Sequence, residues 1–423
     1  MRFAFVTPRY GADVPGGAEH VCRLIAEQVG RRHDVEVLTT CARDPRAWKN
    51  DYSEGVDRVR GALVRRFAVS QGNDAPPPQP SDRALIGPPV RAEELDWIRR
   101  SGPWSPGLLE HLKRQHRSYD AVVFFSVWNP LTIHGLSIAP ERSVLVPHLH
   151  LQPALRFGIV AEALASAGAV GYISAAERRL LRSYVRVTPR YEEIVGIGID
   201  PSPEQSYPKH QQNPADTVSQ ADEDEEPEAD EAEEVAWLAG RGIPFRRRHR
   251  LYGSFALYGG RVEPDNGSEE LLEYFDTYAS GDGDTVLVLM GVKMMRVPEE
   301  RYVRLAGVLP ERERMIAYEA ADVTIAPASD DLTAQPVLES FAVGTPVLAC
   351  ARNDAAVEHC RRSNAGLYYA NRDEFVEALR LLTTSSRVRE RLAANGRSYI
   401  TQHYRWDAVL GRFDRLVSRV RGR

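Results

Sequence analysis

The stretch ADVTIAPASDDLTAQPVLESFAVGTPVLA, residues 321–349, is the strongest indication of the fold in this sequence. Its apolar residues 323–326 predict a buried strand, and residues 337–343 have the spacing of a short helix that ends at a glycine. The loop between a strand end and a helix start is where open α/β sheets bind ligands. Asp331 and Glu339 place two carboxylates around this loop, so we expect a small-molecule site there.

The beginning of the chain carries a second pattern of strand, loop and helix. An apolar strand over 3–6 is followed by a loop with Gly16 and Gly17, a helix over 18–29 and another strand over 35–39. Glycines at the mouth of a helix let the backbone approach an anionic ligand closely. A plain glycine pair in a loop is an equally good interpretation, because the G-x-G-x-x-G pattern of dinucleotide-binding proteins is absent from this loop.

Two α/β series, separated by a change in composition, predict two domains. Residues 202–234 are rich in Pro, Gln, Asp and Glu without apolar periodicity, so we expect a solvated or disordered segment there. The predicted fold class is α/β, with two Rossmann-like α/β/α domains that face a cleft. The predicted parts are a Rossmann-like domain over 1–201, an acidic flexible linker over 202–235, a second Rossmann-like domain over 236–404 and an amphipathic helix over 405–423.

The net charge of −5 comes from one segment of the chain. Ten acidic residues lie within 222–234, and without them the chain has 54 basic and 49 acidic residues, a net charge of +5. The remaining chain is mildly basic, which suits an anionic small ligand and falls short of the basic surface that nucleic-acid binding requires. We therefore expect a small-molecule partner and no nucleic acid.

The four cysteines form no C-x-x-C pair and no zinc-like spacing, which is typical of a protein from a reducing compartment. No apolar run reaches the roughly 18 residues of a membrane span, and the first residues lack the pattern of a signal peptide. We expect a cytoplasmic protein, with a peripheral contact to the inner face of a membrane as an alternative.

Two histidines follow the predicted strand over 143–146. In an extended segment, His148 and His150 face the same side because they are two residues apart. A metal site needs further ligands, and no cluster of His, Cys or carboxylate residues lies nearby in the sequence, so we expect no metal site. A histidine that donates or accepts hydrogen bonds at a strand end is the favoured interpretation.

A set of short motifs recurs in a fixed order along nearly the whole chain. The motifs are Gly16-Gly17, Pro147-x-x-His150, Val195-Gly-Ile-Gly-Ile-Asp200, Gly260-Arg261 with Gly267, Asp331-x7-Glu339, Gly344-Thr-Pro346-Val347, Ser363-Asn-Ala-Gly366-Leu-Tyr-Tyr and Tyr404-x-Trp406. In this order they resemble the motifs of GT-B fold glycosyltransferases of the family 4 type. The resemblance implies a retaining, metal-independent enzyme without a cofactor, which moves a sugar from a nucleotide-diphosphate sugar to an acceptor hydroxyl. The acceptor (a glycan, a lipid-linked molecule or a small molecule) and the oligomeric state stay open.

The resemblance also assigns roles to parts of this chain. It implies that the domain over 1–201 lies on the acceptor side, that the domain over 236–404 binds the nucleotide sugar, and that the helix over 405–423 crosses back to pack on the N-terminal domain. Arg261 meets the leaving diphosphate, for which its planar fork of donors is suited, and an ion pair with Glu263 on the surface is the alternative.

The remaining roles that the resemblance implies concern the donor sugar and the nucleotide. Glu339 binds the ribose hydroxyls, Asp331 binds hydroxyls of the donor sugar, and His150 contacts the sugar or the leaving oxygen. The backbone N–H of Gly17 faces the diphosphate. The further donor-binding residues that we expect are Gly16, Asn266, Leu332 and Thr333.

Three positions depart from the pattern of the resembled family. Asn266 stands where the family has a lysine, and Lys293 or Arg296 is the candidate replacement. Asp331 is one methylene shorter than the family's glutamate, and Leu151-Gln152 stand where close relatives have acidic residues. These departures keep two other functions open: a catalytically weak GT-B protein that binds a nucleotide or sugar and acts as a partner or regulator, and a different GT-B enzyme such as a nucleotide-sugar epimerase or a phosphorylase.

Overall fold

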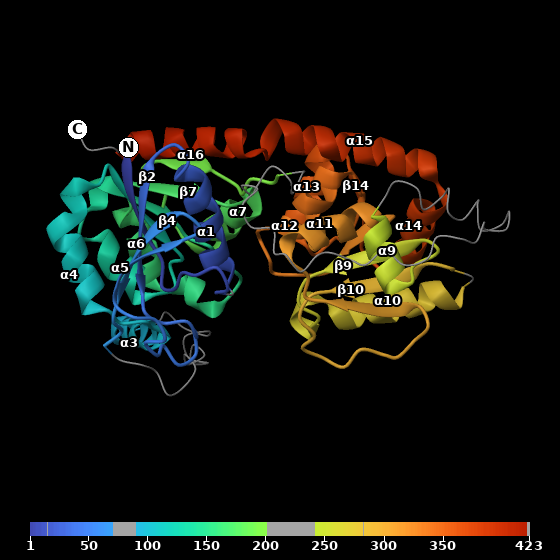
Figure 1. The fold of residues 1–423 in the computed structure, drawn as a ribbon, viewed down its shortest axis with the longest axis horizontal. Helices are drawn as coiled ribbons and strands as arrows, with labels where there is room; N and C mark the ends of the chain where they lie inside the picture. Colours follow the sequence, from blue (N-terminus) through green and yellow to red (C-terminus); the bar gives the residue numbers. More distant parts are fainter. Residues whose placement is uncertain (15, 71–89, 201–241, 282, 421–423) are drawn as a thin grey trace, which may run out of the picture. The chain divides into compact units, whose positions relative to one another are not determined.

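The computed structural model describes residues 1–14, 16–70, 90–200, 242–281 and 283–420. The chain divides into two compact units: unit 1 consists of Met1–Gly198 and Trp406–Arg423, and unit 2 of Ile199–Arg405. Each unit contains a largely parallel sheet with helices packed against it (Figure 1), which confirms the predicted α/β class with two parallel-sheet domains. The predicted acidic linker lies outside the described residues.

The sheet of unit 1 has the strand order β3-β4-β2-β1-β5-β6-β7-β8, and only β3 and β4 pair in the antiparallel direction. Its strands are β1 (Arg2–Val6), β2 (Asp34–Thr40), β3 (Gly55–Val59), β4 (Ala62–Phe67), β5 (Ala121–Phe125), β6 (Ser143–Val146), β7 (Ala169–Tyr172) and β8 (Glu192–Ile194). Its helices are α1 (Gly17–Val29), α3 (Arg91–Ser101), α4 (Pro106–Gln115), α5 (Pro130–Leu136), α6 (Gly158–Ser166), α7 (Ala175–Tyr184) and α16 (Trp406–Val420), with short 3₁₀ helices at His116–Ser118, Pro140–Arg142 and Pro153–Arg156. The central strand β5 is buried at all five positions, as its continuous apolar sequence requires.

The last helix, α16, completes the core of unit 1. The helix lies beside α1 and β7 (Figure 1). The ring of Phe413 lies 5.9 Å from that of Phe3 and 6.0 Å from that of Phe5. The indole of Trp406 covers Gly198, where a Cβ atom would lie only 2.3 Å from it. The helix predicted for residues 405–423 is therefore present, and its contacts lie within unit 1.

One predicted strand of unit 1 is shorter than expected. The apolar residues of the sequence over 194–200 predict a strand there, but β8 spans Glu192–Ile194 and ends where that strand would begin. The reason is Gly196, whose φ of +76° turns the backbone out of the extended conformation. Its N–H and that of Val195 both point to the carbonyl of Tyr172, so the regular ladder stops there.

The sheet of unit 2 is entirely parallel, in the order β11-β10-β9-β12-β13-β14. Its strands are β9 (Phe255–Gly259), β10 (Val286–Met290), β11 (Val303–Gly307), β12 (Val323–Ala326), β13 (Val347–Cys350) and β14 (Gly366–Tyr369). Its helices are α9 (Ile243–His249), α10 (Ser268–Ser280), α11 (Glu311–Ala320), α12 (Gln335–Val343), α13 (Asp354–Ser363), α14 (Arg372–Thr384) and α15 (Ser386–His403), with a 3₁₀ helix at Pro264–Asn266.

Residues 321–349 form β12, a loop, α12 and most of β13. The strand β12 has the predicted bounds, whereas the helix begins at Gln335, two residues earlier than predicted. Ala334 precedes it with φ of +47°, and Gly344 ends it with φ of +83°. Because β12 pairs with β9, the loops that follow these two strands leave the same edge of the sheet side by side.

Candidate functional site

The loop after β9 approaches the loop after β12 at Gly267, which precedes α10. Gly267 has φ of +66°, and a Cβ atom on it would lie 2.7 Å from the carbonyl oxygen of Ala328. A side chain at this position would therefore separate the two loops. The glycine that the sequence motif contains is required by this close approach.

Arg261 follows β9 and extends into solvent. Its side chain is 66% exposed, and its Nη2 lies 2.8 Å from Oε1 of Glu263. The backbone carbonyl of Arg261 accepts a hydrogen bond from the Tyr258 hydroxyl at 2.7 Å, which fixes the loop while the guanidinium stays at the surface. The structure thus contains the ion pair that the sequence analysis named as the alternative for Arg261.

Asn266, which stands in place of a lysine, links the two loops. Its Nδ2 donates to Oε1 of Glu263 at 2.8 Å, and its Oδ1 accepts from the Ser329 hydroxyl at 3.2 Å. The Ser329 hydroxyl also accepts from the backbone N–H of Asp331 at 3.1 Å. A chain of hydrogen bonds therefore runs from Glu263 through Asn266 to the loop that carries Asp331.

Asp331 is exposed, and one of its oxygens is engaged within its own loop. Oδ1 accepts from the backbone N–H of Thr333 at 2.9 Å and from its hydroxyl at 2.6 Å. This local turn fixes the direction of the carboxylate and orients Leu332 and Thr333 ahead of α12. Among the described residues, both hydrogen bonds that Thr333 donates to this carboxylate go to Oδ1 and not to Oδ2.

Glu339 lies on α12 and is 4% exposed, yet its carboxylate is well paired. Arg314 on α11 donates from Nε to Oε2 at 2.9 Å and from Nη2 to Oε1 at 2.7 Å, and Gln335 donates from Nε2 to Oε1 at 2.8 Å. Burial by itself would lower the pKa of Arg314, but the neighbouring Glu339 holds that pKa above its usual range. Three donors therefore hold the Glu339 carboxylate in one geometry.

Sequence reasoning missed the two partners of Glu339. Gln335 lies one helical turn before Glu339, and this i, i+4 spacing is visible in the sequence. Arg314 lies on another helix, and no local pattern connects it to Glu339. Only the packing of α11 against α12 brings them together.

The loop with Gly16 and Gly17 in unit 1 lies against the side chains of Glu19 and His148. Gly16 has φ of +149°, and a Cβ atom on it would lie 2.2 Å from Oε2 of Glu19, which pairs with the buried Arg9. A Cβ atom on Gly17 would lie 2.5 Å from Nε2 of His148. The structure therefore brings Gly17 together with His148, whereas the predicted site residue is His150.

His148 occupies a left-handed backbone conformation, with φ of +48°, which non-glycine residues rarely adopt. Its carbonyl accepts from the indole N–H of Trp128 at 3.2 Å, and the ring of Trp128 lies 5.4 Å from that of His150. His150 is exposed. A strained backbone that is fixed by its surroundings is a feature of functional loops.

A buried carboxylate holds this histidine loop. Glu177 on α7 is 1% exposed, and it accepts from the N–H of Leu149 at 2.8 Å, from the N–H of Ile173 at 2.6 Å and from the backbone of His148. Burial raises the pKa of Glu177 to about 7, although the three backbone donors act in the opposite direction. The sequence shows Glu177 only as a residue in the first turn of a helix, so its role was not predicted.

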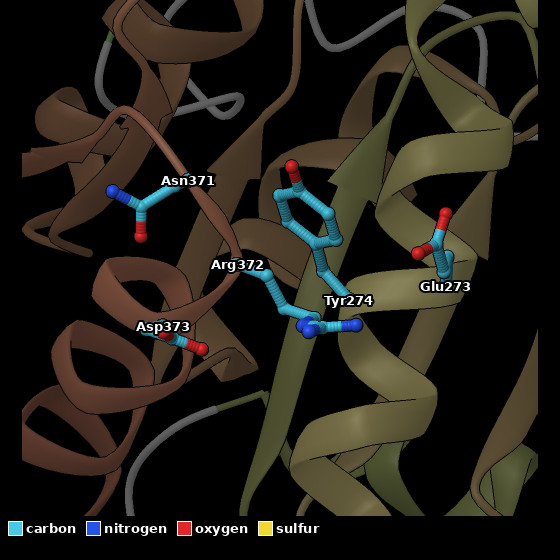
Figure 2. A pocket seen from close by; sticks show the side chains of 5 residues that line it. All are labelled: Glu273, Tyr274, Asn371, Arg372 and Asp373. Carbon is cyan, nitrogen blue, oxygen red and sulfur yellow. The ribbon is translucent and has the colours of Figure 1, made fainter.

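A surface pocket of unit 2 lies away from these residues. It has a volume of about 330 Å³ and is lined by Glu273, Tyr274, Asn371, Arg372 and Asp373. Figure 2 shows these side chains, with Arg372 extending from the start of α14 toward α10. None of the residues predicted for the site lines this pocket.

Within residues 1–14, 16–70, 90–200, 242–281 and 283–420, no group of three or more His, Cys, Asp or Glu residues is arranged to hold a metal ion. In the same part of the chain, none of the helices combines the length and the apolar character that crossing a membrane requires.

Comparison with known proteins gives one family match and several structural neighbours. Residues 244–399 match the family model described as Glycosyl transferases group 1. The sucrose-phosphate synthase from Thermosynechococcus elongatus has 14% sequence identity and a TM-score of 0.63, with 99% of this chain and 98% of that chain covered. HepE from Anabaena, in complex with UDP and glucose, has 14% identity and a TM-score of 0.63, with 99% of each chain covered.

WaaG, described as a glycosyltransferase involved in lipopolysaccharide biosynthesis, has 17% identity and a TM-score of 0.59, with 98% of this chain and 99% of that chain covered. At these identities the structural likeness shows the fold alone, and the family match carries the activity class. The fold shared over nearly the entire chain and the family match over residues 244–399 together support a GT-B glycosyltransferase.

Proposed function

We propose that the chain moves a sugar from a nucleotide-diphosphate sugar to an acceptor hydroxyl, with retention at the anomeric carbon and without a metal ion. In this reaction the bond from the anomeric carbon to the leaving phosphate oxygen breaks. The acceptor oxygen bonds to the same face of the sugar, and its proton passes to the leaving phosphate. The observation that carries the proposal is the buried, hydrogen-bonded carboxylate of Glu339 on α12, the helix that follows the loop after β12.

The proposed role of Glu339 is to bind the ribose of the donor. A carboxylate can accept about four hydrogen bonds, two on each oxygen. Oε1 of Glu339 accepts one from Arg314 and one from Gln335, and Oε2 accepts one from Arg314. The remaining position on Oε2 suits a ribose hydroxyl. That HepE was solved with UDP and with UDP-glucose supports a nucleotide-sugar donor for this chain as well.

The proposed role of Arg261 is to bind the diphosphate. Its ion pair with Glu263 is exposed, and such a pair contributes only about 0.2–1 kcal/mol. A diphosphate offers more charge and can take two parallel hydrogen bonds from a guanidinium, so it competes effectively with Glu263. Lys293 is the proposed second cation, because its backbone pairs with that of Val262, the neighbour of Arg261.

The remaining predicted residues keep their expected roles in this proposal. Asp331 binds a sugar hydroxyl through Oδ2, while Thr333 holds Oδ1. The backbone N–H of Gly17 keeps its proposed role at the diphosphate, and His150 keeps its proposed contact with the sugar or the leaving oxygen. We add His148 to this group because its ring lies against Gly17.

The experiment that tests this function is calorimetric titration with UDP, GDP and ADP in the presence of a chelator. One of the nucleotides is expected to bind the unmodified chain, and Glu339→Gln is expected to weaken that binding by about tenfold or more. Glu377→Gln, on an exposed position of α14, is the matched control and is expected to bind normally. Equal binding by both variants would remove Glu339 from the site.

The anomeric configuration of the product, read by NMR with the matching donor sugar, tests retention.

A second candidate function is binding of a nucleotide or sugar without transfer. Asn266 favours it, because this residue replaces one expected phosphate cation and is committed to hydrogen bonds with Glu263 and Ser329. Loss of one transition-state donor typically lowers a rate by about 100-fold to 1,000-fold. Nucleotide binding without either sugar transfer or donor hydrolysis would favour this candidate over the enzyme.

A further inference from the structure

Three arginines of the described residues are buried: Arg9, Arg66 and Arg246. Two of them have a carboxylate partner. Arg9 lies 2.7 Å from Glu19, and Arg246 lies 3.6 Å from Asp322. Arg66 forms no ion pair with any carboxylate in the described ranges, and its Nη1 is buried without a hydrogen-bond partner there. A buried cation without an anion is unfavourable, so this position calls for a ligand of opposite charge.

Two other buried polar atoms lie on the same side of the unit 1 sheet. Arg66 on β4 is the register partner of Thr39 on β2, so their side chains face the same side. Val37 and Val64, two residues earlier on these strands, belong to the core cluster that also contains Tyr10. The hydroxyls of Thr39 and Tyr10 are both buried, and neither has a hydrogen-bond partner among the residues with described positions. Three polar groups are thus left unsatisfied near the carboxyl ends of neighbouring strands.

Within the part of the chain that the structure describes, an aromatic ring and not a bonded anion lies against the Arg66 guanidinium. The ring of Tyr52 lies 4.1 Å from the guanidinium carbon, and Asp57, Cys41 and Tyr10 act on the charge through space. Burial is the largest influence and lowers the pKa of Arg66, while these neighbours act in the opposite direction. Burial also raises the pKa of Tyr10, so its hydroxyl keeps the proton that it would donate.

We propose that Arg66, Tyr10 and Thr39 form a buried oxyanion-binding site in unit 1, and that the oxyanion is a phosphate or carboxylate group of the acceptor. The guanidinium supplies the charge and the N–H donors of Nη1, and the two hydroxyls supply further hydrogen bonds. A bound oxyanion satisfies all three groups at once. The assignment of this oxyanion to the acceptor rests on the proposed glycosyl transfer, whereas the site itself does not.

The test uses the full chain and two probes, inorganic phosphate and acetate, each compared with sodium chloride at equal ionic strength. At about ten times the dissociation constant, the bound anion is expected to raise the melting midpoint by about 3 °C or more. In chloride, the Arg66→Met variant is expected to have a melting midpoint no lower than that of the unmodified chain. Phosphate or acetate is expected not to raise the melting midpoint of this variant. Arg58→Met, which removes an exposed arginine from the neighbouring strand β3, is the matched control and is expected to keep the response to the anion.

Tyr10→Phe and Thr39→Val give a second test that does not disturb the charge. Each removes an unpartnered hydroxyl, so the fold is expected to be unaffected in chloride, and the affinity for the preferred anion is expected to fall by about fivefold. A response to phosphate alone identifies a phosphorylated acceptor, and a response to acetate alone identifies a carboxylated one. No response to either anion in the unmodified chain, or an unchanged response in Arg66→Met and Tyr10→Phe, would overturn the site.

This outcome is separable from that of the proposed function, because anion binding is measured without a nucleotide. Nucleotide binding through Glu339 together with no oxyanion response overturns the anion site and leaves the transfer proposal intact. An oxyanion response in a chain that binds no nucleotide supports the site and overturns the proposed donor.

Discussion

Replacing the buried Glu177 by glutamine is expected to change how the stability of the protein depends on pH. The carboxylate accepts backbone N–H groups of Leu149, Ile173 and His148, and it holds the histidine loop in its left-handed conformation. Glutamine has one acceptor oxygen and one NH₂ group, so Glu177→Gln places a donor against at least one backbone N–H. The cost of that mismatch is about 1–3 kcal/mol at every pH.

The pH dependence follows from the raised pKa of Glu177. Burial moves this pKa from 4.5 to about 7 in the folded state. The folded protein therefore holds the proton on Glu177 more tightly than the unfolded chain does, and the contribution of Glu177 to stability is greatest below pH 4.5. As the pH rises from 4.5 to 7, the contribution of Glu177 to the free energy of unfolding decreases by about 3 kcal/mol. Above pH 7 this contribution no longer changes with pH.

The assay is urea unfolding between pH 4.5 and pH 8 for the unmodified chain, Glu177→Gln and Glu162→Gln. Glu162 is an exposed residue on α6 and serves as the control for loss of a carboxylate in the same unit. The free energy of unfolding of the unmodified chain minus that of Glu177→Gln is expected to decrease by about 3 kcal/mol over this range, whereas the difference for Glu162→Gln is expected to stay constant. A difference for Glu177→Gln that is constant or rises with pH would refute this account.

Three further perturbations test other parts of the structure. Asn266→Lys is expected to tighten binding of the preferred nucleoside diphosphate by about tenfold in calorimetry, because it restores a cation; unchanged affinity would mean that this position lies away from the phosphates. Phe413→Ala is expected to lower the free energy of unfolding of unit 1 by about 3–5 kcal/mol in urea, since this ring is buried against Phe3; a loss below about 1 kcal/mol would argue against a core role for α16. Gly17→Ala is expected to slow sugar transfer by roughly tenfold or more, because its Cβ atom displaces the His148 ring. Transfer at the original rate would show that the position of this ring is unimportant.

Much of the fold could be predicted from local sequence patterns. The strand β12 has its predicted bounds because an apolar run ends at Pro327, which cannot continue a ladder. The start of α12 was misplaced because Ala334 adopts a left-handed conformation that its identity does not signal. The strand predicted over 194–200 was too long because Gly196 was interpreted as a close-approach residue, while it is a turn.

The candidate site was less predictable, because its geometry depends on contacts between separate elements. Glu339 was selected from a motif, but its partner Arg314 comes from another helix. Arg261 was expected to bind phosphate, and in the structure its side chain pairs with Glu263. The sequence does not show which of the two neighbouring arginines lacks an anion. In the described residues Arg65 pairs with the buried Glu36, whereas Nη1 of Arg66 has no hydrogen-bond partner. Whether a charge is paired is a property of the packing.

The position of α16 has a consequence for how the protein is made. The core of unit 1 draws on the first residues of the chain and on the helix Trp406–Val420, while all of unit 2 lies between them in the sequence. A ribosome therefore releases every strand and helix of unit 2 before it releases the helix that covers Phe3 and Phe5. The unit whose synthesis begins first is the last to complete its core, and until then its apolar face needs protection from aggregation.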